Sequence, residues 1–186
     1  MLIANDADVV IEGLAGQYGL PRWLFSELAD ARGRATPSAT FHAGSFPVVL
    51  FSPGLGSSRW LASTWATELA SHGAIVVALD HPFDAAATRI LDGAIAMSGL
   101  VATGDATEDN RNAASWTETR AKDLSALLDA LVAAKQHNPV LAGADMDRVV
   151  VVGHSLGGAA ALLAGGTDLR VDGVADIDGM PRFSGE

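Results

Sequence analysis

The stretch Val149-Val-Val-Val-Gly-His-Ser-Leu-Gly-Gly158 decides the fold of this chain. A run of four valines is typical of a strand that is buried on both faces, and here the run stops at a glycine. The residues that follow, Gly158-Ala-Ala-Ala-Leu-Leu163, favour a helix of small side chains. The sequence therefore predicts a strand, a sharp turn and a helix in direct succession.

Ser155 lies at the centre of this turn, in a G-x-S-x-G pattern. Between a strand and a helix, that pattern predicts a nucleophile elbow, a strained turn that exposes the serine hydroxyl beside the helix N-terminus. Gly153 and Gly157 suit such a turn, because a Cβ at either position would collide with the returning chain. The alternative is a glycine-rich turn in which the serine has no chemical role.

Length and composition indicate one domain and exclude several kinds of function. The 186 residues are 49% apolar, which is enough for a core, but no apolar stretch reaches the ~20 residues of a membrane helix. A net charge of −10 argues against nucleic acid or an anionic membrane as the partner. The absence of cysteine excludes disulfides and zinc–thiolate sites. We expect no metal and no cofactor; no signal peptide is visible, and the compartment stays open.

Apolar runs alternate with helical patterns along the chain, which predicts an α/β fold with a largely parallel sheet. Strands are expected at residues 47–52, 74–80, 148–152 and 171–178. Helices are expected at residues 21–32, at residues 60–72, and from a capping box at Ser115-Trp-Thr-Glu118 through the leucines up to residue 131. Residues 33–45 form an expected linker, and residues 81–115 an excursion over the sheet edge.

A second glycine-rich turn, Ser52-Pro-Gly-Leu-Gly56, follows the first expected strand. Acyl transfer needs hydrogen-bond donors aimed at the oxygen that becomes negative in the tetrahedral intermediate. In the elbow architecture, one donor is the N–H of the residue after the nucleophile, here Leu156. The other comes from the loop after an earlier strand, here Leu55. A tight glycine turn without a chemical role is the other interpretation of this loop.

Several further stretches point to one family. They are residues 46–56, Leu69-Ala-Ser-His-Gly73, Val77-Ala-Leu-Asp-His-Pro82, Arg120-Ala-Lys-Asp-Leu124 and Ile177-Asp-Gly179. Together with the elbow they resemble the α/β-hydrolases related to plasma-type platelet-activating-factor acetylhydrolase. The resemblance implies an α/β-hydrolase fold, a mostly parallel sheet flanked by helices. Pro53 is a departure, because many relatives carry histidine there, but a backbone donor at Leu55 does not depend on that side chain.

The resemblance also implies the acid of a Ser-His-Asp triad. In this branch the acid follows the strand after the elbow helix, in an Ile-Asp-Gly context, and that position is Asp178. A carboxylate at the carboxyl end of a parallel strand lies on the same edge as the nucleophile, where it can orient an imidazole. Asp176 is the competing choice, and it has no counterpart in the family pattern.

The chain contains no histidine after Asp178, although the chain order of this fold is Ser, Asp, His. All five histidines precede the acid, at His42, His72, His81, His137 and His154. Of these, His81 alone is expected at the correct edge of the sheet, and a structural hydrogen bond to a neighbouring loop is the expected role there. No catalytic histidine is therefore assigned.

We interpret residues 1–186 as a single, partial α/β-hydrolase domain without the N-terminal hairpin and the C-terminal strand, histidine loop and helix of its relatives. The strand before Asp178 would then be a poorly covered edge. The family resemblance implies a serine esterase that forms an acyl-enzyme on short-acyl or lipid-like esters, and thus acts in lipid degradation. Without the base, the chain is expected to be weakly active or inactive.

Two alternatives stay open for the function. One is a cutinase-like polyester hydrolase or general lipase, whose acid would lie beyond Glu186. The other is a non-catalytic binding protein built on the same scaffold. In the enzyme readings the partner is a small ester or lipid-like substrate, and Leu55, Trp60 and Phe83 are expected to give the site an apolar mouth.

Overall fold

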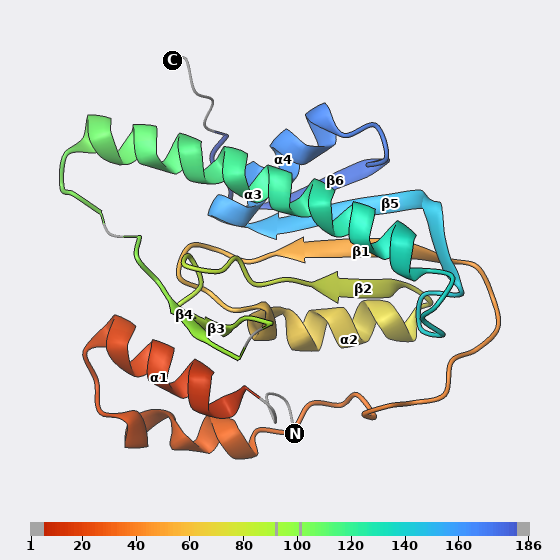
Figure 1. The fold of residues 1–186 in the computed structure, drawn as a ribbon, viewed down its shortest axis with the longest axis horizontal. Helices are drawn as coiled ribbons and strands as arrows, with labels where there is room; N and C mark the ends of the chain where they lie inside the picture. The colour runs from red at the N-terminus through yellow and green to blue at the C-terminus, as the bar shows by residue number, and fades with distance from the viewer. Residues whose placement is uncertain (1–5, 92, 101, 182–186) are drawn as a thin grey trace.

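The computed structural model describes residues 6–91, 93–100 and 102–181 (Figure 1). At its centre is a parallel sheet with the strand order β2-β1-β5-β6. The strands are β1 (Phe46–Ser52), β2 (Ile75–Ala78), β5 (Ala144–His154) and β6 (Gly173–Ile177). Their register places Leu50 of β1 between Val77 of β2 and Val151 of β5. All four strands predicted from the sequence are present, and β6 lies at an edge of the sheet.

Helices cover both faces of this sheet (Figure 1). The 3₁₀ turn η2 (Arg59–Ala62) and α2 (Ser63–Ser71) pack on one face, whereas α3 (Ala106–Ala134) and α4 (Leu156–Thr167) pack on the other. Side chains alternate along β1, so Val48 and Leu50 contact the α3 side, and Val49 and Phe51 the α2 side. Because both faces are covered, the strand is apolar at successive positions.

Two N-terminal helices lie outside the sheet. α1 (Ala7–Tyr18) packs with the 3₁₀ helix η1 (Arg22–Asp30) and against a hairpin of β3 (Ala87–Arg89) and β4 (Ile95–Met97). A Cβ on Gly13 of α1 would lie 2.7 Å from Ala87, so the contact with β3 is close. The sequence pattern did not indicate α1, and the helix expected at residues 21–32 is 3₁₀ in form. Residues 33–45 form the predicted linker.

The start of α3 corrects the sequence-based prediction. The helix begins at Ala106, within the segment expected to be irregular, and the capping box at residues 115–118 lies inside it. Asp105 is the actual N-cap, because its carboxylate accepts hydrogen bonds of 2.9 Å from the N–H groups of Thr107 and Glu108. Residues 115–118 therefore continue a helix that an earlier cap has already started.

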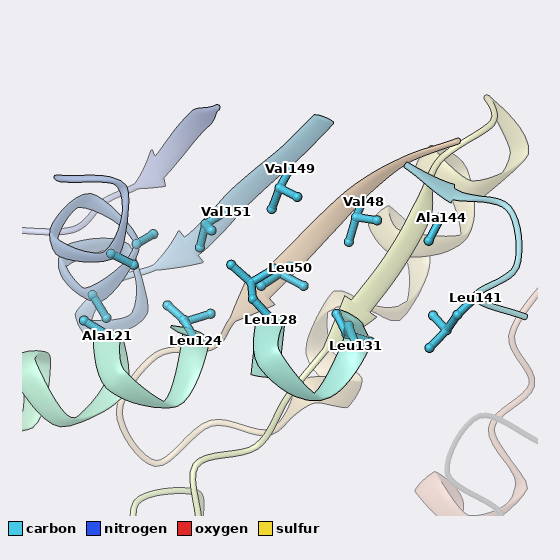
Figure 2. Packing of buried hydrophobic residues seen from close by; sticks show 13 residues of the cluster. Val48, Leu50, Ala121, Leu124, Leu128, Leu131, Leu141, Ala144, Val149 and Val151 are labelled. Carbon is cyan, nitrogen blue, oxygen red and sulfur yellow. The ribbon is translucent and has the colours of Figure 1, made fainter. Parts of the chain in front are cut away.

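One face of α3 forms the core with β1 and β5 (Figure 2). Leu124, Leu128 and Leu131 point from α3 toward the valines of the two strands. Leu124 and Leu128 have exposed fractions of 0% and 1%. Their i, i+4, i+7 spacing is the predicted helical period. This core fixes the positions of the strand ends from which the candidate site is built.

Replacing Leu128 by alanine should lower the free energy of unfolding by about 2–5 kcal/mol, because the cavity left in the core cannot fully collapse. The matched control is Val132→Ala on the same helix, where the side chain is 49% exposed. That variant should change stability by less than about 0.5 kcal/mol. Urea unfolding of both variants measures these changes. Equal losses of unfolding free energy would contradict the placement of Leu128 in the core.

Candidate active site

Ser155 alone makes the turn between a strand and a helix. β5 ends at His154 and α4 begins at Leu156. The backbone of Ser155 has φ 52° and ψ −122°, outside the regions that residues with a side chain normally occupy. Such strain persists only where the surrounding structure determines the conformation. The predicted order of strand, sharp turn and helix is present.

Two close approaches hold this turn. A Cβ at Gly153 would overlap the carbonyl oxygen of Gly157, and a Cβ at Gly157 would overlap that of Ser52. The turn therefore packs against both its own helix and the end of β1. A third contact comes from β6, because the N–H of Ser155 donates a 2.9 Å hydrogen bond to the carbonyl of Ile177.

Two backbone N–H groups beside Ser155 have no hydrogen-bond partner in the part of the chain that the structure describes. The N–H of Leu156 is the first of α4, where a helix offers no acceptor of its own. The N–H of Leu55 belongs to the loop after β1. Neither group makes a hydrogen bond to any residue that the structure describes. Gly54 brings this loop against the turn, since a Cβ there would lie 3.4 Å from the Cβ of Ser155.

The side chain of Ser155 opens into a hollow of about 390 Å³. Four of the predicted site residues line it together: Leu55, Ser155, Leu156 and Asp178. The remaining lining residues were not predicted, and they are Ala102, Asp109, Ala113, Trp116 and Met180. The walls are thus mainly apolar, with a carboxylate at two places.

Asp109 lies in the part of α3 that the sequence did not predict, and Trp116 lies in the expected capping box, so neither was expected at the site. They lie seven residues apart on α3, a spacing that puts both on one face of a helix. The N–H and the hydroxyl of Thr103 donate to the Asp109 carboxylate at 2.7 and 2.9 Å. These hydrogen bonds lower the pKa of Asp109 below its ordinary value, so this wall of the hollow carries a negative charge.

Asp176 and Asp178 have different surroundings. The carboxylate of Asp176 accepts a 2.8 Å hydrogen bond from the N–H of Gly179 and lies where a Cβ on Gly158 would be. Its role is to close the turn after β6. Asp178 lines the hollow, is exposed, and has a left-handed backbone with φ 57°. Of the two acids, Asp178 is the one that faces the same space as Ser155.

His81 is 3% exposed and belongs to a buried polar chain. Its Nε2 lies 2.9 Å from the Ser52 hydroxyl, and its Nδ1 lies 2.6 Å from the Asp123 carboxylate. These two bonds use both ring nitrogens, so the ring joins the end of β1 to α3. The role is structural, as expected, but the partners lie on a strand and a helix and not on a neighbouring loop.

The other histidines also lie away from Ser155. His154 lines a separate hollow with Trp65 and Ile177. His72 is exposed and bonds to the carbonyl of Glu68 in its own helix. His42 and His137 are exposed. Within the described residues, no histidine lines the hollow that contains Ser155.

The apolar mouth is made differently from the prediction. Leu55 lines the hollow, but Trp60 lines a neighbouring cavity of about 240 Å³ between α1 and the loop after β1. Phe83 is 61% exposed and is absent from the described lining of the hollow. Trp116 supplies the aromatic wall instead.

The described residues contain no group of three or more histidine, aspartate or glutamate side chains placed to hold a metal ion. None of the helices in the described part of the chain has both the length and the apolar content that crossing a bilayer requires.

The family of platelet-activating factor acetylhydrolase, isoform II, matches residues 12–123 of this sequence. The chain belongs to this family. The probable 1-alkyl-2-acetylglycerophosphocholine esterase of Arthroderma benhamiae is 29% identical over 182 residues, which cover 92% of this chain and 42% of that protein. The platelet-activating factor acetylhydrolase of Canis lupus familiaris is 28% identical over 187 residues, 85% of this chain and 41% of that protein.

Among solved structures, a ferulic acid esterase from Streptomyces cinnamoneus is similar in fold and sequence. The TM-score is 0.70 at 33% identity, and the match covers 85% of this chain and 44% of the esterase. The α/β-hydrolase fold that the resemblance implied is thus confirmed. This chain spans less than half the length of each of these three proteins.

Replacing Gly157 by alanine should destabilise the fold, because the new Cβ would meet the carbonyls of Ser52 and Pro53, which are backbone atoms. The matched control is Gly166→Ala in the same helix, where a Cβ meets nothing within 4 Å. That variant should not lower stability, because Gly166 lies in the last turn of α4 with open space at its Cβ position, and the gain should stay below the ~1 kcal/mol of a helix interior. Thermal unfolding separates the two, and a neutral Gly157→Ala variant would show that the turn is not tightly packed.

Proposed function

We propose that this chain carries the nucleophile, both oxyanion donors and the acid of a serine carboxylic-ester hydrolase. The proposal rests on one observation above all: Ser155 has a strained backbone and lies beside the N–H groups of Leu55 and Leu156, which bind no other described residue. Strained backbone conformations of this kind are found mainly at functional sites. They cost free energy, which the rest of the fold has to offset. Family membership supports the same conclusion.

In the proposed reaction, Ser155 Oγ attacks the ester carbonyl while an imidazole base takes its proton. The carbonyl oxygen becomes negative and accepts hydrogen bonds from Leu55 and Leu156. Collapse of the tetrahedral intermediate breaks the bond to the alcohol, which leaves with the proton from the imidazolium. Water then attacks the acyl-enzyme by the same steps and releases the acid.

Asp178 is the proposed partner of the base. A carboxylate that accepts the Nδ1–H of a histidine selects its tautomer and stabilises the imidazolium that forms. Asp178 can do this from the edge of the hollow, where it faces the same space as Ser155. The imidazole itself must enter this space, since no histidine of the described residues lies there.

The lining of the hollow supports short-acyl or lipid-like esters as substrates. Leu55, Trp116 and Met180 offer apolar surface to an acyl chain, and Asp109 and Asp178 disfavour an anionic group close to the nucleophile. Esters of the class named for the Arthroderma benhamiae relative, 1-alkyl-2-acetylglycerophosphocholines, are therefore the first natural substrates to test.

Adding imidazole to the 186-residue chain should produce turnover of a p-nitrophenyl short-chain ester, because free imidazole can act as the missing base. The rate, after subtraction of hydrolysis by imidazole alone, should depend on Ser155. The control is Ser155→Ala at the same imidazole concentrations. Equal rates for the two proteins, with both folded by circular dichroism, would favour a non-catalytic binding protein.

The test of Asp178 uses a longer version of the chain that includes a histidine base. In that protein, Asp178→Asn should lower kcat by about 10⁴-fold, because the histidine loses its orienting carboxylate. Asp176→Asn is the matched control, since an amide oxygen can still accept from the N–H of Gly179. Steady-state kinetics on the same ester measures both. Retained turnover in Asp178→Asn would instead support a polyester hydrolase or lipase with its acid elsewhere.

A further inference from the structure

A buried ion pair lies beneath the loop that carries Leu55, and the proposed reaction does not use it. Arg120 of α3 is 2% exposed and Asp84 is 6% exposed. The Arg120 Nε and Nη2 donate to the two carboxylate oxygens of Asp84 at 2.6 and 2.5 Å. Burying two charges costs hydration, and such a pair is therefore weak support for stability in itself. The contacts of this pair with the backbone indicate that it fixes the position of the loop.

The pair holds three consecutive peptide units of the loop. The Arg120 guanidinium donates through Nη1 to the carbonyl of Pro53 and through Nη2 to the carbonyl of Gly54, the latter at 3.3 Å. The Asp84 carboxylate accepts from the N–H of Gly56 at 3.4 Å. The contacts thus lie on both sides of Leu55, whose own N–H has no partner among the described residues.

The contact with Gly54 sets the direction of the Leu55 N–H. The Gly54 carbonyl and the Leu55 N–H belong to one planar trans peptide unit, so they point in opposite directions. Because the carbonyl faces Arg120 in the interior, the N–H faces away from Arg120. Gly54 approaches Ser155 closely, and Leu55 lines the same hollow, so this outer side is where the N–H meets a ligand.

We propose that Arg120 is a positioning residue of the oxyanion hole, and that Asp84 holds its guanidinium in place. This inference rests on the proposed function, because the Leu55 N–H matters only if an oxyanion forms at Ser155. A fork of donors is needed, since one side chain binds two backbone carbonyls and a carboxylate at once. Arginine provides that geometry and lysine does not.

Four variants separate positioning from stability. Arg120→Met removes the fork but leaves Asp84 buried without a partner, which can unfold the chain. The double variant Arg120→Met/Asp84→Leu removes both charges, so it avoids that penalty and still lacks the carbonyl contacts. Arg120→Lys keeps the charge alone. Leu128→Ala is the matched control, because it lowers stability from the same helix at a core position away from the loop.

Turnover is measured with imidazole added, on a p-nitrophenyl ester and on its thionoester, in which sulfur replaces the carbonyl oxygen. Sulfur is a larger and poorer hydrogen-bond acceptor, so donors set for oxygen favour the ester. In the double variant, kcat for the ester should fall by about 10- to 100-fold with little change in KM, since one oxyanion donor is misdirected. The preference for the ester over the thionoester should fall with it. Compared with the double variant, Arg120→Lys should recover only part of kcat and only part of the preference for the ester.

Two outcomes would overturn the inference, and they are distinguishable. If wild-type turnover depends on Ser155 but the double variant loses no more kcat and no more ester preference than Leu128→Ala, the pair is structural and the proposed function stands. If wild-type turnover does not depend on Ser155, the proposed function fails and the inference fails with it.

Discussion

The contact between Gly157 and the end of β1 is the constraint on which the candidate site depends. A Cβ at Gly157 would overlap the carbonyl of Ser52, so α4 can begin where it does only because this residue has no side chain. That contact joins the strained turn at Ser155 to the loop that carries Leu55. This contact therefore brings the N–H of Leu55, in the loop after β1, close to the N–H of Leu156, at the start of α4.

The loop after β1 is held from two directions. Gly157 packs on the carbonyl side of Ser52 and Pro53, and Arg120 binds the carbonyls of Pro53 and Gly54. Further polar pairs brace this end of the sheet, including His81 with Ser52 and Asp123. The cluster between α3, β1 and β5 is apolar, as Figure 2 shows. The buried pair Arg120 and Asp84 and the buried His81 thus all contact the end of β1 or the loop that follows it.

The sheet and the turn could be predicted from the sequence because they depend on local patterns. Runs of β-branched residues and the spacing of Gly153 and Gly157 around Ser155 carry that information within a few positions. The start of α3 could not be predicted as well, because Asp105 is one of several acidic residues in a segment without a clear period. Asp109 was missed in the hollow for that reason.

The sequence indicates that Arg120 is buried, but it does not indicate which residue pairs with it. It lies four residues before Leu124 and eight before Leu128, on the buried stripe of a helix, where an arginine is unusual. That position indicates a buried charge with a partner. The partner, Asp84, lies far away in the chain, and only the tertiary structure brings the two together.

The hydrogen bond from the Ser155 N–H to the Ile177 carbonyl has a consequence for the order of folding. The contacts of Gly153 and Gly157 hold the turn from one side, and the pairing of β6 with β5 adds this bond, because it comes from the last residue of β6. A nascent chain whose β6 is still unpaired can already contain β1, β5 and their core. In such a chain the turn lacks one of the three contacts that hold its strained backbone, so all three are present only after β6 has paired.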